Sequence, residues 1–320
     1  MLKLLSYLYG RGVARRNDRY DRHTLPIVPV DKPVISVGNL TTGGSGKTPT
    51  VQMLVRLLLS EGRRPAIVMR GYGRRSRGLL VVHDGQNICA SVDAAGDEAF
   101  LHAQTLNVPV VVSSDKVEAA AYAAGTLPCD VIVVDDGFQH RALHRDIDMV
   151  IVDRSTITGT LLPAGRLREP HTSLSRADIV LITEDVHHGD VEAFLNPTAH
   201  VFRLERAFTC MAPTTVPVVA VSGIARPERF HDALRQRGYS IAATKTFRDH
   251  HRYTAFNIRT IVREAHAHHA QIITTAKDAV KLRPLLTSDE RMPQISVLEL
   301  EIRVHSSSSF LSAVLPRISP

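Results

Sequence analysis

Short runs of β-branched apolar residues alternate with helix-like stretches through the first two thirds of the chain. Apolar side chains occupy successive positions in these runs, which is typical of strands buried on both faces. Six runs are candidate strands: 34–37, 66–69, 108–113, 131–136, 148–153 and 178–183. Segments 48–59 and 116–124 have helical spacing. This alternation predicts an α/β fold with a mainly parallel sheet covered by helices on both sides.

The alternation breaks between about Pro197 and Pro217. It then resumes with "VPVVAVSGI", "IITTAKDAV" and "ISVLELEI", which predict a second, smaller α/β unit. We therefore expect a basic amphipathic segment at 1–26, a core domain at 27–200 and a smaller α/β domain at 201–320.

The first segment predicts a helix with an apolar side followed by basic residues. The apolar positions are Leu2, Leu4, Leu5, Leu8 and Val13. Six basic and two acidic residues give 1–26 a net charge of 6 − 2 = +4. Such a helix suits a membrane interface or packing against its own domain, and the pattern alone leaves both open.

Composition narrows the class of protein. Apolar residues make up 44% of the 320 positions and charged residues 22%, as in globular proteins. The three cysteines, Cys89, Cys129 and Cys210, form no CxxC pair, which favours reduced thiols in the cytoplasm. The net charge of +7 and the basic loop "RGYGRRSRG" favour an acidic partner: a phosphorylated substrate, an anionic membrane or nucleic acid.

The stretch "GNLTTGGSGKTPT" follows the first candidate strand and precedes a helix. Gly46, Lys47 and Thr48 match the end of the Walker A pattern, although Thr41 stands at its first glycine position. Backbone N–H groups in such a loop bind phosphates, the lysine reaches the β- and γ-phosphates, and the threonine hydroxyl binds Mg²⁺. The expected nucleotide-binding loop consists of Thr42, Gly43, Gly44, Ser45, Gly46, Lys47 and Thr48.

The strand in "CDVIVVDDGFQH" ends in Asp135 and Asp136. Two carboxylates at the end of a strand beside a P-loop predict the opposite side of a Mg²⁺ site. Two classes of P-loop protein fit less well. The guanine-binding N-K-x-D is missing from "TTAKDAVKL", and Thr42 replaces the extra lysine of partitioning ATPases.

These motifs together resemble the tetraacyldisaccharide 4′-kinase family of lipid A biosynthesis. "VGNLTTGGSGKTPTV", "MRGYGRRSRG", "GDEAFLHA", "VIVVDDGFQHRALHRDIDMVIVD", "LLPAGRLREP", "TFRDHHRYT" and "TTAKDAVKL" follow the family's order from about residue 34 to 283. The resemblance implies transfer of the ATP γ-phosphoryl group to the 4′-hydroxyl of a tetraacylated disaccharide 1-phosphate. It also implies Mg²⁺, a peripheral position on the cytoplasmic face of the inner membrane, contact with anionic lipid, and no nucleic-acid partner.

Residue roles follow from the same resemblance. Lys47 is the expected phosphate lysine. The expected metal ligands are Thr48, Asp135, Asp136 and Glu169. Arginines of the basic loop and of "GRLREP" are expected to bind substrate phosphate: Arg70, Arg74, Arg75 and Arg168, with Arg166 as a further neutralising charge.

The acceptor hydroxyl needs a base. The resemblance assigns this role to Asp97, supported by His250 or, as a second choice, by His251. The alternative from another class is a P-loop ATPase switch that binds a protein or nucleic-acid partner and uses hydrolysis for timing.

Overall fold

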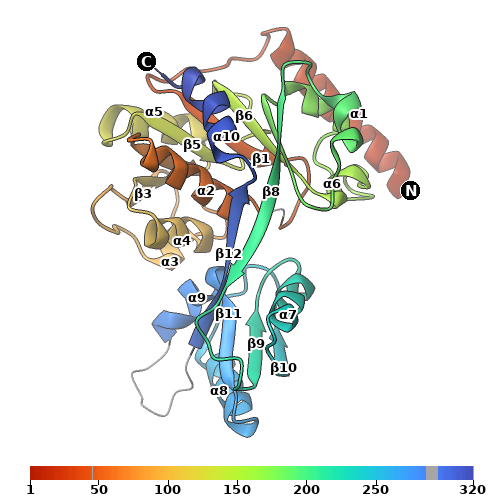
Figure 1. The fold of residues 1–320 in the computed structure, drawn as a ribbon. Coiled ribbons are helices and arrows are strands. Elements are labelled where there is room, and N and C mark those ends of the chain that lie inside the picture. Colours follow the sequence, from red (N-terminus) through yellow and green to blue (C-terminus); the bar gives the residue numbers. More distant parts are fainter. Residues whose placement is uncertain (45, 286–294, 320) are drawn as a thin grey trace.

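The computed structural model describes residues 1–44, 46–285 and 295–319. Its strands form a 12-stranded sheet in the order β10-β9-β11-β12-β8-β7-β6-β1-β5-β2-β4-β3. Figure 1 shows a larger unit above and a smaller unit below, joined by the long strands β8 and β12.

The larger unit contains the sheet from β8 to β3. Its strands are β1 (Val34–Asn39), β2 (Pro65–Met69), β3 (Leu80–His83), β4 (Val110–Val112), β5 (Val131–Asp135), β6 (Ile147–Val152), β7 (Ile179–Ile182) and β8 (His200–Thr209). Neighbouring strands run parallel except at the β3 edge, where β3 pairs antiparallel with β4. β1 lies between β5 and β6, so the loops that follow β1 and β5 meet at one edge of the sheet.

Helices cover both faces of this sheet because its strands are apolar on both sides. The helices of the larger unit are α1 (Leu2–Asp21), α2 (Lys47–Ser60), α3 (Val92–Ala95), α4 (Asp97–Thr105), α5 (Lys116–Thr126) and α6 (Arg154–Ile157). Short 3₁₀ turns follow at η1 (His171–Arg176), η2 (His188–Asp190) and η3 (Glu192–Phe194). Ile35 faces α2 and α4 in one core, whereas its neighbour Val34 packs with α5 in the other.

The smaller unit is built from β9 (Val218–Ser222), β10 (Ile241–Thr246), β11 (Gln271–Thr275) and the first part of β12 (Ile295–Val304). Its helices are α7 (Pro227–Gln236), α8 (Ala255–Ala267) and α9 (Ala276–Leu282), followed by η4 (Arg283–Leu285). These strands pair parallel to one another.

β12 belongs to both units. Its first residues pair with β11, whereas Glu299 to Val304 pair antiparallel with β8. The chain then forms α10 (Ser307–Val314) and η5 (Leu315–Arg317), and Phe310 and Val314 enter the same core as Ile35. The expected boundary at residue 200 therefore differs from the packing: β8 and the C-terminal segment lie with the larger unit, because their apolar side chains complete its sheet and core.

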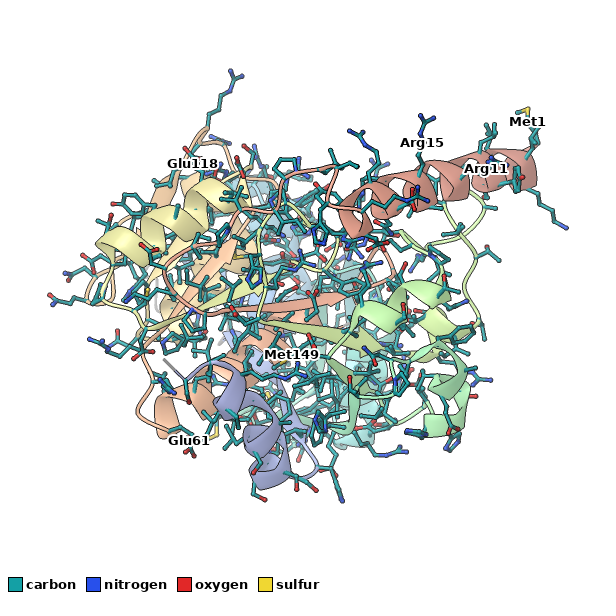
Figure 2. The ribbon with its side chains drawn as sticks, turned by 90° about the horizontal axis from the view of Figure 1, so that it is seen from above. Met1, Arg11, Arg15, Glu61, Glu118 and Met149 are labelled. Carbon is teal, nitrogen blue, oxygen red and sulfur yellow. The ribbon has the colours of Figure 1, made fainter. Side chains whose placement is uncertain are left out.

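α1 lies along the edge of the larger unit, with Met1 at its outer end (Figure 2). Its C-terminal half is anchored, since Asn17 is buried and Arg141 donates to the Asn17 carbonyl oxygen at 3.1 Å. Its first turns leave Leu2, Leu4 and Leu8 exposed at 56%, 63% and 55%. None of the helices within the described ranges has the length and apolar character that crossing a bilayer requires.

Candidate active site

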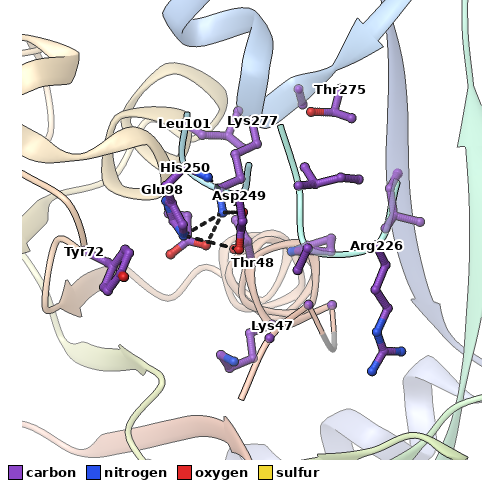
Figure 3. Close-up of a pocket in the computed structure, with 18 of the residues that line it drawn as sticks. Lys47, Thr48, Tyr72, Glu98, Leu101, Arg226, Asp249, His250, Thr275 and Lys277 are labelled. Carbon is purple, nitrogen blue, oxygen red and sulfur yellow. Dashed lines mark hydrogen bonds and ion pairs between the residues drawn. The ribbon is translucent and has the colours of Figure 1, made fainter. Parts of the chain in front are cut away.

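A cavity of about 660 Å³ lies between the two units, at the edge of the sheet where β1 and β5 end. Residues from both units line it (Figure 3). Lys47, Arg70 and Asp136 come from the larger unit, and Arg226 and His250 from the smaller one. This placement gives a ligand in the cavity contacts with both halves of the molecule.

The predicted phosphate-binding loop forms one wall. Thr42, Gly43, Gly44, Gly46, Lys47 and Thr48 line the cavity, while Ser45 lies outside the described residues. Gly46 has φ = +88° and caps the N-terminus of α2, a backbone conformation that favours glycine. The positive end of the α2 dipole and its free N–H groups therefore point into the cavity, as phosphate binding requires.

Asp136 lies opposite this loop and carries much of the local charge balance. Its carboxylate accepts hydrogen bonds from both terminal nitrogens of Arg168 at 2.8 and 2.7 Å, and Lys47 Nζ lies 3.6 Å from Oδ1. Burial raises the pKa of Asp136, but Lys47, Arg168 and Lys116 outweigh it, so the pKa lies well below its usual range. Asp136 is therefore ionised at neutral pH.

Lys116 supports both acidic residues from behind, a role that sequence reasoning did not assign. Its buried ammonium donates to the Asp135 carbonyl oxygen at 2.9 Å and to the Asp136 carbonyl oxygen at 2.5 Å. Asp136 has φ = +53°, so these bonds hold an unfavourable backbone conformation for a non-glycine residue. Desolvation lowers the pKa of Lys116, against the effect of the neighbouring carboxylates.

The surroundings of Asp135 show whether this site could hold a cation. Its Oδ1 is buried and has no hydrogen-bond partner among the described residues, and His102 Nε2 lies 3.7 Å from Oδ2. A buried carboxylate oxygen without a partner is costly unless a ligand binds it. With Asp136 and the Thr48 hydroxyl at the same cavity, the donor set is all oxygen, which suits Mg²⁺.

The expected catalytic pair comes together across the two units. His250 Nδ1 lies 3.0 and 3.1 Å from the two carboxylate oxygens of Asp97, and Lys281 Nζ lies 3.2 Å from Oδ2. Burial raises the pKa of Asp97, but the hydrogen bond from His250 and the charges of Lys277 and Lys281 hold it far below its usual range. His250 lines the cavity, whereas Asp97 is buried behind it.

Three more charged residues surround this pair. Lys277 Nζ lies 3.2 Å from Glu98 Oε1 and 3.2 Å from Asp249 Oδ1, and all three line the cavity. These residues belong to motifs of the sequence, but their roles were not predicted. Two features of the sequence could have indicated them: "GDEAF" places Glu98 next to Asp97, and "TTAKDAVKL" places Lys277 at the start of a helix.

The predicted phosphate-binding arginines divide into two groups. Arg70 and Arg168 line the cavity. Arg74 donates to the carbonyl oxygens of Val112 and Gly78 and stabilises its own loop, and Arg75 pairs with Asp93 at 3.3 Å on the surface. The last two do not line the cavity.

Glu169 and His251 also lie away from the cavity. Glu169 is fully buried and accepts hydrogen bonds from Arg176 at 2.7 Å and Asn17 at 3.1 Å. Its carboxylate thus ties α1 to η1, and the structure does not bring it to the other expected metal ligands. His251 stacks on Phe247 with ring centroids 4.6 Å apart, so His250 is the histidine that reaches Asp97.

A second part of the cavity wall is apolar and basic. It is lined by Arg206, Phe208, Ile224, Ala225, Arg226, Arg229, Phe230, Leu298 and Leu300. Arg226 also bridges the units, donating to Asp153 Oδ2 at 3.2 Å and to the Ser155 hydroxyl at 2.8 Å. An apolar wall with cationic edges suits a flat, uncharged group attached to phosphates.

Comparison with known proteins places this geometry in one family. A family model described as tetraacyldisaccharide-1-P 4′-kinase matches residues 1–319. The tetraacyldisaccharide 4′-kinase of Desulfotalea psychrophila is 40% identical over 309 residues, covering 90% of this chain and 86% of that protein. The enzyme of the same name from Koribacter versatilis is 39% identical over 322 residues, covering 97% of each chain.

A solved structure shares the whole architecture. LpxK from Aquifex aeolicus, crystallised in complex with ATP, aligns with a TM-score of 0.81 and 32% identity, covering 98% of both chains. The predicted α/β P-loop fold and the family resemblance are thereby confirmed. The chain belongs to the tetraacyldisaccharide-1-phosphate 4′-kinase family.

Proposed function

We propose that this protein transfers the γ-phosphoryl group of ATP to the 4′-hydroxyl of a tetraacylated disaccharide 1-phosphate, with Mg²⁺, as a step of lipid A biosynthesis. The observation that carries the proposal is one cavity that joins the P-loop lysine Lys47 to the Asp97–His250 pair. A kinase needs a phosphate cradle and an acceptor base at one site, whereas an ATPase switch needs no base for a sugar hydroxyl.

ATP and Mg²⁺ fit at the P-loop. The N–H groups of 42–44 and 46–48 and the Lys47 ammonium hold the β- and γ-phosphates, and the apolar wall with Phe208 takes the nucleobase. Thr48, Asp135 and Asp136 would hold the metal ion, which would offset the negative charge of the phosphates. Glu169 has its oxygens engaged by other residues, so its proposed metal role requires it to exchange Arg176 for the ion.

The acceptor hydroxyl binds in the part of the cavity that is lined by His250 and Tyr72. The family resemblance implied Asp97 as the base and His250 as its support. Because His250 lines the cavity and Asp97 lies behind it, the structure favours the reverse: His250 is the base and Asp97 supports it. His250 Nε2 takes the proton as the hydroxyl oxygen attacks the γ-phosphorus and the bond to ADP breaks. Asp97, held ionised, stabilises the imidazolium that results.

The phosphate of the lipid binds to basic side chains that line the same cavity. Arg70 lines the cavity and is exposed, which supports a role in gripping the acceptor. Arg168 serves the transferring phosphate and Asp136 instead. Arg74 and Arg75 contribute by shaping the loop that carries Arg70, because their own contacts lie within and beside it.

The enzyme works at the cytoplasmic face of the inner membrane as a peripheral protein. The exposed leucines of α1 and the +4 charge of 1–26 support this proposal, because apolar and basic groups together bind anionic lipid surfaces. The helix therefore contributes in both ways that its sequence left open: its first turns face the lipid and its last turns pack on the protein.

An assay with γ-labelled ATP and a tetraacylated disaccharide 1-phosphate in detergent micelles tests the function. We expect ADP release that depends on the lipid and a labelled lipid with one more phosphate at the 4′ position. A switch would instead release ADP in response to a macromolecular partner and leave the lipid unlabelled.

A further inference from the structure

Lys277 has a contact that neither phosphate binding nor an ordinary ion pair explains. Its Nζ lies 3.0 Å from His250 Nε2, in addition to the carboxylates of Glu98 and Asp249. Figure 3 shows the four side chains converging at one end of the cavity. The Lys277 side chain is only 18% exposed, so the position of its ammonium is restricted.

The contact determines which ring nitrogen of His250 carries the proton. An ammonium has only donors, so Nε2 must accept from Lys277, and the ring hydrogen of neutral His250 must lie on Nδ1. Nδ1 is the nitrogen beside both Asp97 oxygens, so its N–H donates to a carboxylate. Burial lowers the pKa of Lys277, but Glu98, Asp97 and Asp249 outweigh this and raise it, so the side chain is a cation.

A second lysine on the same helix makes a useful comparison. Lys281 lies one turn further along α9 and contacts Asp97 Oδ2 at 3.2 Å and Asp278 Oδ1 at 3.3 Å. Two carboxylates satisfy this ammonium, as Glu98 and Asp249 would satisfy Lys277. The additional contact of Lys277 with the imidazole is therefore specific to its place at the cavity.

We propose that Lys277 is a positioning residue that holds His250 in the Nδ1–H tautomer and covers Nε2 until the acceptor hydroxyl displaces it. The inference rests on the proposed role of His250 as the group that takes the hydroxyl proton. While the ammonium occupies the Nε2 lone pair, a water molecule cannot be activated there, and ATP is protected from hydrolysis. Acceptor binding frees Nε2, and the proton passes from the hydroxyl oxygen to that nitrogen.

Nitrogen NMR of the ligand-free protein labelled with ¹⁵N-histidine tests the tautomer. His250→Gln identifies the two His250 signals by their loss. The wild type should show a protonated, pyrrole-type Nδ1 and an unprotonated, pyridine-type Nε2. Lys277→Met should mix the two tautomers, whereas Lys281→Met, which removes a charge of the same helix without touching the ring, should leave Nδ1 protonated.

A wild-type His250 protonated on Nε2, or a Lys277→Met spectrum identical to the wild type, would overturn the inference. Lys277→Arg provides a second variant if Lys277→Met does not fold. Its guanidinium is also a pure donor, so a switch to the Nε2–H tautomer in that variant would equally contradict the proposal.

The covering role is tested by comparing hydrolysis with transfer. Lys277→Met should raise the ratio of acceptor-free ATP hydrolysis to lipid phosphorylation by roughly tenfold, the scale of one charge-assisted hydrogen bond released from Nε2. An unchanged ratio would remove this part of the inference. The NMR result needs neither nucleotide nor lipid, so it stands or fails separately from the proposed kinase activity.

Discussion

Asp136 connects several charged residues at the P-loop: Lys47 and Arg168 face its carboxylate, and Lys116 holds its backbone. Two helices and the loop that contains Arg168 contribute these cations, so the loop after β5 is held by three separate segments of the chain. Lys47 and Arg168 both line the cavity, and Lys47 is the one that belongs to the P-loop. Its loss should therefore affect phosphate binding while Arg168 keeps Asp136 in place.

Lys47→Ala should lower the turnover of lipid phosphorylation by roughly two to three powers of ten, the scale of losing one preorganised charge at the transferring group. Steady-state kinetics with the lipid acceptor measures this. Lys245→Ala is the control, because Lys245 pairs with Glu264 at 2.7 Å on the smaller unit and does not line the cavity. Turnover near wild type in Lys47→Ala would mean that the loop has only a structural role.

The sequence allowed the glycine-rich loop, the paired acids and the Asp97–His250 pair to be predicted, because each belongs to a recognisable motif. Lys116 and His102 were not predicted, since a polar residue near a helix start or within a helix reads as exposed until its burial is known. Glu169 illustrates the opposite case. Its motif indicated a metal ligand, but its surroundings of Arg176, Arg16 and Asn17 depend on the packing of α1.

At the scale of the elements, strands with a clear local apolar pattern could be predicted from the sequence, whereas strands without one could not. The nine apolar runs chosen from the sequence correspond to β1, β2, β4, β5, β6, β7, β9, β11 and β12. β3, β8 and β10 were missed. β10 alternates between partly buried and exposed positions, and β8 reads "HVFRLERAFT" with charged residues among apolar ones. β8 pairs with β12, which is distant in the chain, whereas β10 lies at the edge of the sheet beside the preceding strand β9, so neither strand needs a continuous apolar run.

Helix α1 carries the prediction about the membrane. Leu4→Ser combined with Leu8→Ser should weaken binding to vesicles of anionic lipid and raise the KM for the lipid acceptor, with little change in ATP affinity. Vesicle co-sedimentation at two salt concentrations measures the effect. Leu59→Ser is the control, because Leu59 is an exposed leucine of α2, remote from the proposed lipid surface. Equal binding of all three proteins would contradict the role given to α1.

At the scale of the whole molecule, charged contacts hold the two units around the cavity. Lys281 reaches Asp97, Arg226 reaches Asp153, and Arg252 donates to the Gly73 carbonyl oxygen at 2.8 Å. The long strands β8 and β12 form the covalent and hydrogen-bonded joint behind them (Figure 1). Two buried carboxylates, Asp97 and Asp153, thus contribute ion pairs at the junction of the two units.

The ionisation of Asp97 makes the free energy of unfolding depend on pH. Its pKa is lower in the folded protein than in the unfolded chain, where the pKa of an aspartate is about 4. The stabilisation is therefore complete above the unfolded value and is lost as the pH falls towards the folded value. Asp97→Asn should reduce the free energy of unfolding at pH 7 and make it less dependent on pH below about 5.

Urea denaturation at several pH values measures this change. Asp18→Asn is the control, because Asp18 is a half-exposed carboxylate on α1. A pH dependence in Asp97→Asn as steep as in the wild type would show that the contacts with His250 and Lys281 do not stabilise the fold.

The central claim is that Asp97 of the larger unit and His250 of the smaller unit, whose side chains lie 3.0 Å apart at the cavity between the units, act as one catalytic group. The most direct test is the kcat of lipid phosphorylation for Asp97→Asn, His250→Ala and the double variant, with ATP binding measured alongside. Each single change should lower kcat by roughly two to four powers of ten with little change in ATP affinity. The double variant should be scarcely worse than the poorer single variant, because residues that act as a unit are not additive. Additive losses, or a normal kcat in His250→Ala, would contradict the account.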